Sequence, residues 1–260
     1  MKKTYPSDLT DNQWNHIKEL FETEKQRGRP TAIDLGKVVN GILFILASGC
    51  QWRYLPKEYP KWQSVYYHFR KWKKSGKWKI IYGILYAAYR RKEGRHKHAT
   101  AGAIDSQSVK TTSVPGRRGF DAGKKINGRK RHILVDTLVL MMAVVVTAAS
   151  IQDRDGAKLL LKGINGSGKK LRKIWVDGGY RGEVVNWVKS KCNIVLEVVR
   201  RSEEAQEFVL LPRRWVVERT FSWLGNSRRL AKDYERFCET SETFIYIAMT
   251  RLVLLRLINS

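Results

Sequence analysis

The sequence predicts an α/β protein whose first part is entirely helical. Up to about residue 90, apolar residues recur at the spacing of amphipathic helices. After residue 100 the pattern changes to short apolar runs that alternate with helical segments, which is typical of an α/β fold. A charged segment without apolar period separates the two patterns. We therefore expect a helical domain over 1–90, a linker over 91–100 and an α/β domain over 101–260.

Four helices are expected in the first part. The first follows a capping-box pattern at Thr10 and Gln13. Asp34 is placed to cap the second helix, which stops at Gly49. The third runs over Trp62–Ser75, and a fourth follows directly. We therefore expect a compact bundle of short helices before the linker.

The second part is expected to contain five strands and four helices in the order β-β-β-α-β-α-β-α-α. The expected strands are 101–109, 130–136, 140–148, 171–177 and 193–199. The expected helices are 155–162, 183–191, 211–230 and 241–258.

The charge of the chain indicates a polyanionic partner. The 260 residues include 50 Lys and Arg against 24 Asp and Glu, a formal net charge of +26. A polyanion offsets the self-repulsion of such a chain. The most apolar run, 133–149, is too short to span a membrane and contains Asp136. Cys50, Cys192 and Cys238 lack metal or disulfide spacing, so we expect a cytoplasmic protein that binds nucleic acid, not a membrane.

Three acidic residues are candidates for metal-dependent chemistry on nucleic acid. Asp105 lies in the first expected strand, Asp177 ends the fourth, and Glu218 lies on the helix 211–230. If those two strands are neighbours, the aspartates lie side by side, and a helix across the sheet can bring Glu218 to them. Three carboxylates suit two Mg²⁺ or Mn²⁺ ions that activate a water or a 3′-hydroxyl for phosphoryl transfer.

Each acid also has a simpler interpretation. Asp177 precedes two glycines and fits a turn, while Glu218 could form a helix ion pair with Arg214, four residues earlier. Asp105 is harder to explain structurally, because a carboxylate in an apolar strand is costly without a partner. The competing acids fit other places: Asp136 a hairpin turn, and Asp153 the N-terminus of a helix.

Long sequence motifs resemble one known family across essentially the whole chain. They are YPSDLTDNQW, SGCQWRYLPKEYPKWQSVYYHFRKW, IDSQSVKTT, GFDAGKKINGRKRHILVDT, VDGGYRG and LPRRWVVERTFSWLGNSRRLAKDYE. The chain resembles DDE transposases of bacterial insertion sequences, in the group numbered five. The resemblance implies a ribonuclease-H-like catalytic domain with a mixed five-stranded sheet. It also implies that Asp105, Asp177 and Glu218 are the catalytic, metal-binding triad, with two Mg²⁺ ions.

The chain departs from the family signature at two positions. The wider signature places a Tyr, an Arg, the catalytic Glu and a Lys at fixed spacing, and here Arg214 and Glu218 match. Leu211 stands at the Tyr position and Gly225 at the Lys position. Arg228 or Arg229, one turn further on, is a candidate to contact the phosphate instead.

Three basic stretches are expected to bind DNA. The helix 62–75 is the candidate recognition helix of a helix-turn-helix arrangement, the loop 117–131 is expected to order on DNA beside Asp105, and the third stretch surrounds Glu218. The candidate contact residues are Gln63, His68, Arg70, Lys71, Lys73, Lys74, Arg117, Arg118, Lys124, Lys125, Arg129, Lys130, Arg131, Arg214, Arg219, Arg228 and Arg229.

The sequence thus predicts a DNA transposase. We expect it to bind the terminal inverted repeats of an insertion sequence, to cleave the 3′ ends and to join them to target DNA, working as a homodimer at the bacterial nucleoid. Two alternatives stay open at this point. One is a ribonuclease-H-fold nuclease that only cuts, and the other is a DNA-binding relic without catalytic activity.

Overall fold

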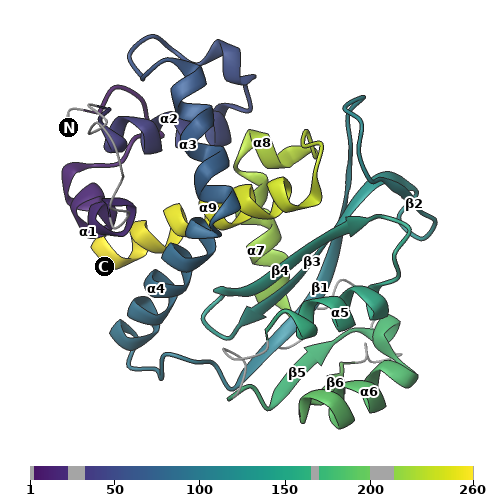
Figure 1. Ribbon diagram of the computed structural model, residues 1–260. Helices are drawn as coiled ribbons and strands as arrows, with labels where there is room; N and C mark the ends of the chain where they lie inside the picture. Colours follow the sequence, from purple (N-terminus) through teal and green to yellow (C-terminus); the bar gives the residue numbers. More distant parts are fainter. Residues whose placement is uncertain (1–2, 23–32, 165–169, 200–213, 260) are drawn as a thin grey trace.

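A computed structural model describes residues 3–22, 33–164, 170–199 and 214–259. Helices of the N-terminal part lie on one side and a curved sheet on the other (Figure 1). The N-terminal elements are α1 (Asp11–Glu22), α2 (Leu35–Ser48), the 3₁₀ turn η1 (Trp52–Tyr54), α3 (Trp62–Lys74) and α4 (Lys77–Lys92). They are followed by β1 (Ala101–Lys110), β2 (Gly119–Asp121), β3 (Ile126–Asp136), β4 (Met141–Ala148), α5 (Asp153–Lys162), β5 (Lys173–Val176), η2 (Gly178–Tyr180), α6 (Glu183–Cys192), β6 (Val195–Val198), α7 (Trp215–Gly225), α8 (Arg228–Ala231) and α9 (Cys238–Asn259).

The caps of the first helices are those that the sequence predicts. The backbone N–H of Thr10 donates to Gln13 Oε1 at 2.9 Å, and the N–H of Gln13 donates to Thr10 Oγ1 at 3.2 Å. This reciprocal pair satisfies two N–H groups that the helix start leaves free. The carboxylate of Asp34 accepts from Lys37 N at 3.1 Å. Helix α2 ends at Gly49, whose φ of 71° is the left-handed conformation that glycine adopts readily.

The sheet is mixed, and β1 lies at its centre. The strands follow the order β2-β3-β1-β5-β6, and β4 pairs with β3. Strand β1 runs antiparallel to β3 and parallel to β5. The α/β class and all five expected strands are confirmed. Strand β2 was missed because it has only three residues, so the described sheet has six strands instead of five.

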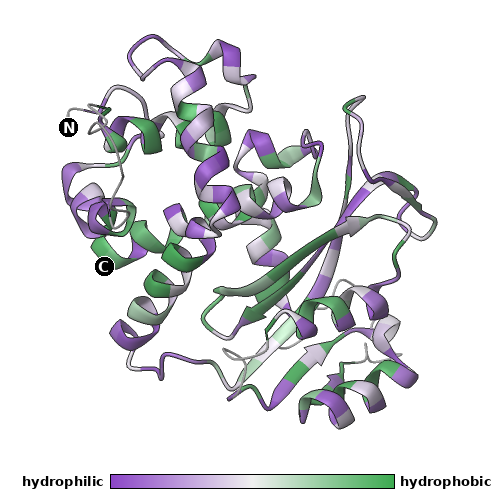
Figure 2. Ribbon diagram, viewed as in Figure 1, coloured by the Kyte–Doolittle hydropathy of each residue, from purple (hydrophilic) through white to green (hydrophobic). Residues whose placement is uncertain are grey.

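Helices cover both faces of the sheet. On one face, Ile104 and Leu134 pack with Leu160 of α5 and Val188 of α6. On the other face, the cluster that contains Ala103 also includes residues of α7 and α9. Strand β4, almost entirely hydrophobic in Figure 2, contributes to both clusters. The sheet is therefore a buried middle layer.

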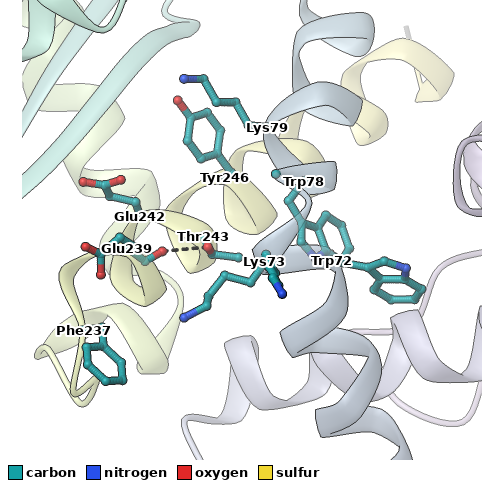
Figure 3. A pocket seen from close by; sticks show the side chains of 11 residues that line it. Trp72, Lys73, Trp78, Lys79, Phe237, Glu239, Glu242, Thr243 and Tyr246 are labelled. Atoms are coloured by element: carbon teal, nitrogen blue, oxygen red, sulfur yellow. Dashed lines mark hydrogen bonds between the residues drawn. The ribbon is translucent and has the colours of Figure 1, made fainter.

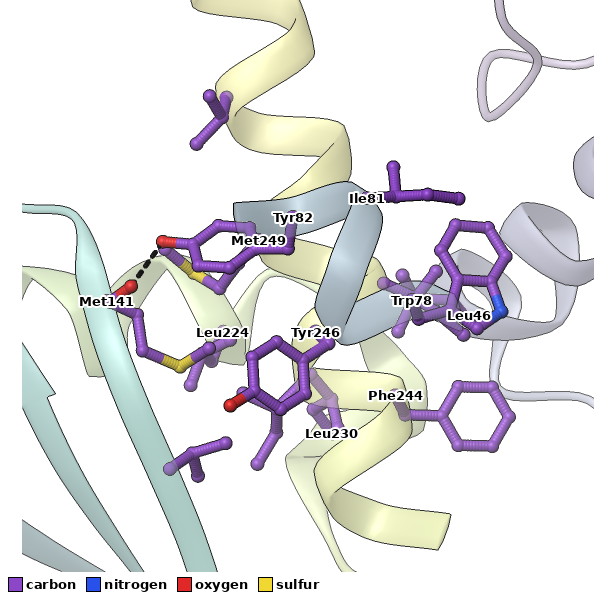
Figure 4. Packing of buried hydrophobic residues seen from close by; sticks show 14 of the residues in the cluster. Leu46, Trp78, Ile81, Tyr82, Met141, Leu224, Leu230, Phe244, Tyr246 and Met249 are labelled. Atoms are coloured by element: carbon purple, nitrogen blue, oxygen red, sulfur yellow. Dashed lines mark hydrogen bonds between the residues drawn. The ribbon is translucent and has the colours of Figure 1, made fainter. Parts of the chain in front are cut away.

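The N-terminal helices share a hydrophobic core with the C-terminal helix. One continuous cluster contains Leu46 of α2, Trp78 of α4, Leu224 of α7 and Met249 of α9 (Figure 4). Helix α9 runs from the sheet to the N-terminal helices and ends beside α1 (Figure 1). The expected boundary at 91–100 thus divides the chain by secondary structure, whereas the core crosses it.

A buried ion pair fixes α4 to the turn between β3 and β4. Arg90 pairs with Asp136, whose side chain is 0% exposed. The same carboxylate accepts from Tyr86 Oη at 3.0 Å and from the backbone N–H groups of Leu138 and Leu140. Asp136 is therefore the hairpin-turn residue that the sequence predicts, and it also joins the two parts of the chain.

The expected helix 211–230 is shorter and broken in the structure. Residues 211–213 lie outside the described part of the chain. Helix α7 ends at Gly225, and the short α8 begins at Arg228. Gly225, Asn226 and Ser227 interrupt the helix because glycine is entropically unfavourable in helices and Asn and Ser favour caps and turns. Across the described residues, no helix combines the length and apolarity needed to cross a membrane.

Candidate active site

Two aspartates meet just beyond the paired part of the parallel strands β1 and β5: Asp105 lies in the middle of β1, and Asp177 directly follows β5. Ala103 pairs with Trp175, so Asp105 and Asp177, each two residues further on, lie at the same level. Both side chains project to the face covered by α7, because side chains alternate along a strand and Ala103 and Trp175 belong to the cluster on that face. The prediction that these two strands are neighbours is confirmed.

Arg214, at the start of α7, contacts both carboxylates. Its Nη2 atom lies 2.7 Å from Asp105 Oδ2 and 3.4 Å from Asp177 Oδ2. The exposed fractions of the side chains are 10% for Arg214, 18% for Asp105 and 33% for Asp177. Asp177 Oδ1 also accepts from Gly179 N at 2.8 Å. Asp177 is therefore both the turn residue of the simpler interpretation and a member of a carboxylate pair.

The pKa of Asp105 is shifted by its surroundings. Desolvation raises the pKa of Asp105 above its ordinary value, and the nearby charge of Asp177 acts in the same direction. Arg214 and the N–H of Ser106 oppose that rise. Tyr180 lies beneath the pair, with a buried hydroxyl that has no hydrogen-bond partner among the described residues. Its pKa is raised by burial and by the charges of Asp105, Asp153 and Asp177.

The aspartate pair fits a divalent cation. Two carboxylate oxygens converge on one cationic atom of Arg214, and oxygen donors are what Mg²⁺ and Mn²⁺ prefer. Glu218 lies one turn after Arg214 on α7, and its side chain is exposed. Within the described residues, no three acidic, histidine or cysteine side chains lie close enough together to hold a metal. The structure therefore brings two of the three expected acids together, and not the third.

A polar network supports Asp105 from the other face of the sheet. Ser106 donates its backbone N–H to Asp105 Oδ1 at 2.7 Å and its hydroxyl to Asp153 Oδ1 at 2.7 Å. Lys130 pairs with Asp153 at 3.1 Å and with Asp121 at 3.0 Å. Lys124 Nζ donates to the Ser106 carbonyl at 2.8 Å. These bonds fix the backbone that carries Asp105.

The structure buries several of the side chains that we expected to bind DNA. They are His68, Arg129, Lys130, Arg131, Arg214 and Arg229. Arg129 pairs with Asp233 at 2.9 Å, Arg229 with Glu235 at 2.6 Å, and Lys130 with the acids named above. The segment 126–136 forms β3, which is buried on both faces. Its basic side chains therefore lie inside the fold and are not part of a flexible loop.

The candidate DNA-contact residues that are exposed include a group on α3. Gln63, Tyr67, Arg70 and Lys74 are exposed along one side of α3 at helical spacing, and Tyr67 takes the place that we expected for His68. In a helix rich in aromatic residues, a tyrosine is expected to lie in the core. The sequence therefore contains no sign that Tyr67 is exposed. Lys71 and Lys73 are partly buried. The other exposed candidates are Arg117, Arg118, Lys124, Lys125, Arg219 and Arg228.

Two tryptophans flank Glu218 and pack with arginines. The guanidinium of Arg219 lies 5.3 Å from the ring of Trp215 and 5.8 Å from that of Trp223. Arg256 of α9 lies 4.3 Å from the Trp223 ring. These cation–π contacts link the exposed side of α7 to α9.

A groove elsewhere on the molecule does not belong to this site. It lies between the α3–α4 turn and α9, and residues such as Trp72, Lys73, Phe237 and Glu242 line it (Figure 3). None of the carboxylates of the candidate site lines this groove. The candidate active site is therefore the surface region around Asp105 and Asp177 and not the groove.

Comparison with known proteins matches both parts of the chain. A family model described as "Transposase DDE domain" matches residues 96–253, and one described as "Putative transposase of IS4/5 family" matches residues 9–82. A curated relative from Burkholderia cepacia, "Putative transposase for insertion sequence element IS402", is 29% identical over 125 residues. That match covers 45% of this chain and 59% of the relative.

A structural comparison gives a weak likeness. A chain of the "Crystal structure of the Mos1 Strand Transfer Complex" aligns over 98% of this chain and 86% of its own length, with 12% identity and a TM-score of 0.24.

Proposed function

Because this chain belongs to the transposase DDE domain family, whose model spans residues 96–253, we propose that it is a DNA transposase. It would cleave the ends of its own mobile element and join the liberated 3′-hydroxyls to target DNA. The observation that carries the proposal is the meeting of Asp105, within β1, and Asp177, just after β5. A metal-dependent phosphoryl transferase needs such a pair at an accessible place.

The carboxylates are proposed to hold divalent cations. Asp105 and Asp177 would bind Mg²⁺, which Mn²⁺ can replace, and Glu218 would complete the set from α7. When bound, the cations supply activation of a water or hydroxyl and stabilisation of the leaving oxygen. The chain itself supplies the sheet that carries the acids and, through Ser106, Lys124 and Asp153, the network that fixes the backbone at Asp105.

Helix α3 is proposed to contact the element's terminal repeats. Its exposed side carries Gln63, Tyr67, Arg70 and Lys74. The major groove of DNA is wide enough to admit an α-helix. Further phosphate contacts are proposed for the other exposed basic residues, which are Arg117, Arg118, Lys124, Lys125, Arg219 and Arg228. Since two transposon ends must be paired, we propose that the protein acts as a homodimer on double-stranded DNA.

The function is tested by a cleavage and strand-transfer assay on labelled DNA that carries the element's own ends. The wild type is compared with Asp177→Asn and with a control, Asp155→Asn, whose exposed carboxylate lies 3.8 Å from Lys158 Nζ. We expect metal-dependent nicking and joined products for the wild type and the control, and neither for Asp177→Asn.

The other outcomes identify the alternatives. Cleavage without joined products at any metal concentration would indicate a nuclease. DNA binding without cleavage in both Mg²⁺ and Mn²⁺ would indicate a DNA-binding relic.

The role of α3 is tested separately by DNA binding as a function of salt. Arg70→Ala removes a phosphate-binding candidate, so the slope of log affinity against log salt should fall by about one. Arg91→Ala, an exposed arginine on α4, is the control and should leave the slope unchanged. Equal slopes for both variants and the wild type would exclude a phosphate contact by Arg70.

A further inference from the structure

One arginine atom lies at the point where a cation would bind. Nη2 of Arg214 is within 2.7 Å of Asp105 Oδ2 and 3.4 Å of Asp177 Oδ2. A divalent cation bound by these two oxygens would occupy the position that the Arg214 guanidinium takes in the structure. The contact of Arg214 and the binding of a cation at this pair therefore exclude each other.

The charge balance favours exchange over a permanent ion pair. Two carboxylates carry two negative charges, and Arg214 supplies one positive charge. A divalent cation supplies two, so its Coulomb attraction to the pair is about twice as large at equal distance. Without either cation, the two carboxylates would repel each other in a partly desolvated place, which explains why the protein holds an arginine there.

Arg214 is itself incompletely satisfied in this position. Its Nε atom is buried and has no hydrogen-bond partner among the described residues. A buried donor without a partner carries a desolvation penalty. This contact is thus weaker than a fully bonded arginine pair, and the penalty is relieved when the side chain leaves.

Arg214 and Glu218 stand on the same side of one helix end. Arg214 is the residue before α7, and Glu218 follows it four residues later, so their side chains are neighbours along the helix. In the structure Arg214 points to the aspartates and Glu218 is exposed. If the Arg214 side chain moves away, it leaves a space beside the aspartates. That space lies on the side of the helix that carries Glu218.

We propose that Arg214 is a displaceable occupant of the cation site. In the metal-free protein it positions Asp105 and Asp177; a divalent cation expels it, and Glu218 then joins the aspartates. This inference rests on the proposed function, because it takes the aspartate pair to be the metal site. Arg214 is thus a positioning residue that competes with the cation.

The test is a titration of the full chain, without DNA, with Mn²⁺ alone, measured by electron paramagnetic resonance of the free ion. We expect Arg214→Gln to bind Mn²⁺ roughly tenfold more tightly than the wild type, which is within the usual range of coupling between two sites. Arg214→Lys keeps the charge but loses the guanidinium and should also bind more tightly. Arg219→Gln removes a charge five residues after Arg214 whose guanidinium packs on the Trp215 ring instead of on the aspartates, and should change the affinity less than about twofold.

Two further readouts complete the test. Glu218→Gln should weaken Mn²⁺ binding severalfold, although Glu218 is exposed in the metal-free structure. The thermal midpoint of Arg214→Gln should be lower than that of the wild type in EDTA, and Mn²⁺ should raise it more than it raises the wild type. A merely structural arginine would lower the midpoint without this larger gain.

The outcomes separate this inference from the proposed function. If Arg214→Gln and Arg214→Lys bind Mn²⁺ no more tightly than a wild type that cleaves DNA, the competition is refuted and the transposase stands. If the wild type and all variants fail to bind Mn²⁺, the metal site and this inference both fail.

Discussion

Two arginine–aspartate contacts join a helix to the sheet in this protein, and they differ in how completely they are bonded. At the β3–β4 turn, the single carboxylate of Asp136 accepts from Arg90, Tyr86 and two backbone N–H groups, and it is fully buried. Beside β1 and β5, Arg214 shares one nitrogen between two carboxylates, one of which is a third exposed.

Asp136 forms a structural joint, an ion pair that holds two elements together. The pair of Asp105 and Asp177 is instead suited to exchanging one cation for another. At Asp136 every donor has an acceptor, and charge is balanced one to one, so nothing is gained by replacing a partner. At the Asp105 and Asp177 pair, negative charge is in excess, and Arg214 keeps an unpartnered buried Nε. An acid pair of this kind has capacity for a cation from outside, whereas Asp136 has none.

The largest loss of stability is expected from removing the carboxylate of Asp136. Asp136→Ala removes the acceptor of four donors and leaves the buried Arg90 without its partner. We expect a loss of unfolding free energy of about 3–5 kcal/mol, the usual result of removing one member of a buried pair. Urea denaturation followed by circular dichroism measures it. A loss below about 1 kcal/mol would mean that α4 is held to the turn by its apolar contacts alone.

A fourth carboxylate, Glu242, is largely buried and has no ion pair with a cation among the described residues. It accepts from Val146 N at 2.8 Å, near Glu239 and Lys79 (Figure 3). Burial raises its pKa to about 7, so its folded form prefers to be protonated. Its contribution to stability is therefore fully present below the unfolded pKa of about 4.5 and is lost as pH rises through 7.

Replacement by glutamine removes this pH dependence. Glu242→Gln keeps an acceptor for Val146 but cannot ionise. At pH 8.5 we expect it to be about 2–3 kcal/mol more stable than the wild type, and at pH 4.5 nearly equal. Denaturation midpoints at the two pH values provide the test. The same difference at both pH values would show that ionisation of Glu242 is not its cause.

The smallest effect on stability is expected at Asp177. Asp177→Asn keeps the acceptor for Gly179 N and removes the repulsion with Asp105, while it weakens one 3.4 Å contact of Arg214. These terms oppose each other, so we expect a change within about 1 kcal/mol in EDTA. Thermal unfolding in EDTA measures it beside Asp136→Ala. A loss as large as that of Asp136→Ala would place Asp177 among the structural joints.

Much of the fold could be predicted because its signals are local. Capping residues such as Thr10 and Asp34, and the alternation of apolar residues, specify elements through interactions within a few residues. The meeting of Asp105 with Asp177 was expected only on the condition that their two strands are neighbours, and the structure meets that condition. The strand β2 was missed because three residues carry too little periodicity to be recognised.

The partners of the basic residues could not be predicted, since they depend on distant parts of the chain. Arg129 and Lys130 read as surface charges in the sequence, yet Asp233 and Asp153 neutralise them inside the fold. Arg131 is buried with one bond, to Gln107 at 3.3 Å, and burial lowers its pKa to about 10. For Glu218, a helix pattern gives the side that it occupies but not the distance to the aspartates.

Asp105 and Asp177 are proposed to form a cation site from which Arg214 is displaced. Diffraction from crystals of the full chain soaked in Mn²⁺, collected at a wavelength where manganese scatters anomalously, shows whether this exchange occurs. We expect an anomalous peak beside the two carboxylates, with the Arg214 side chain moved away and Glu218 turned toward the metal. A saturating soak that leaves Arg214 bonded to both aspartates, with no peak beside them, would contradict it.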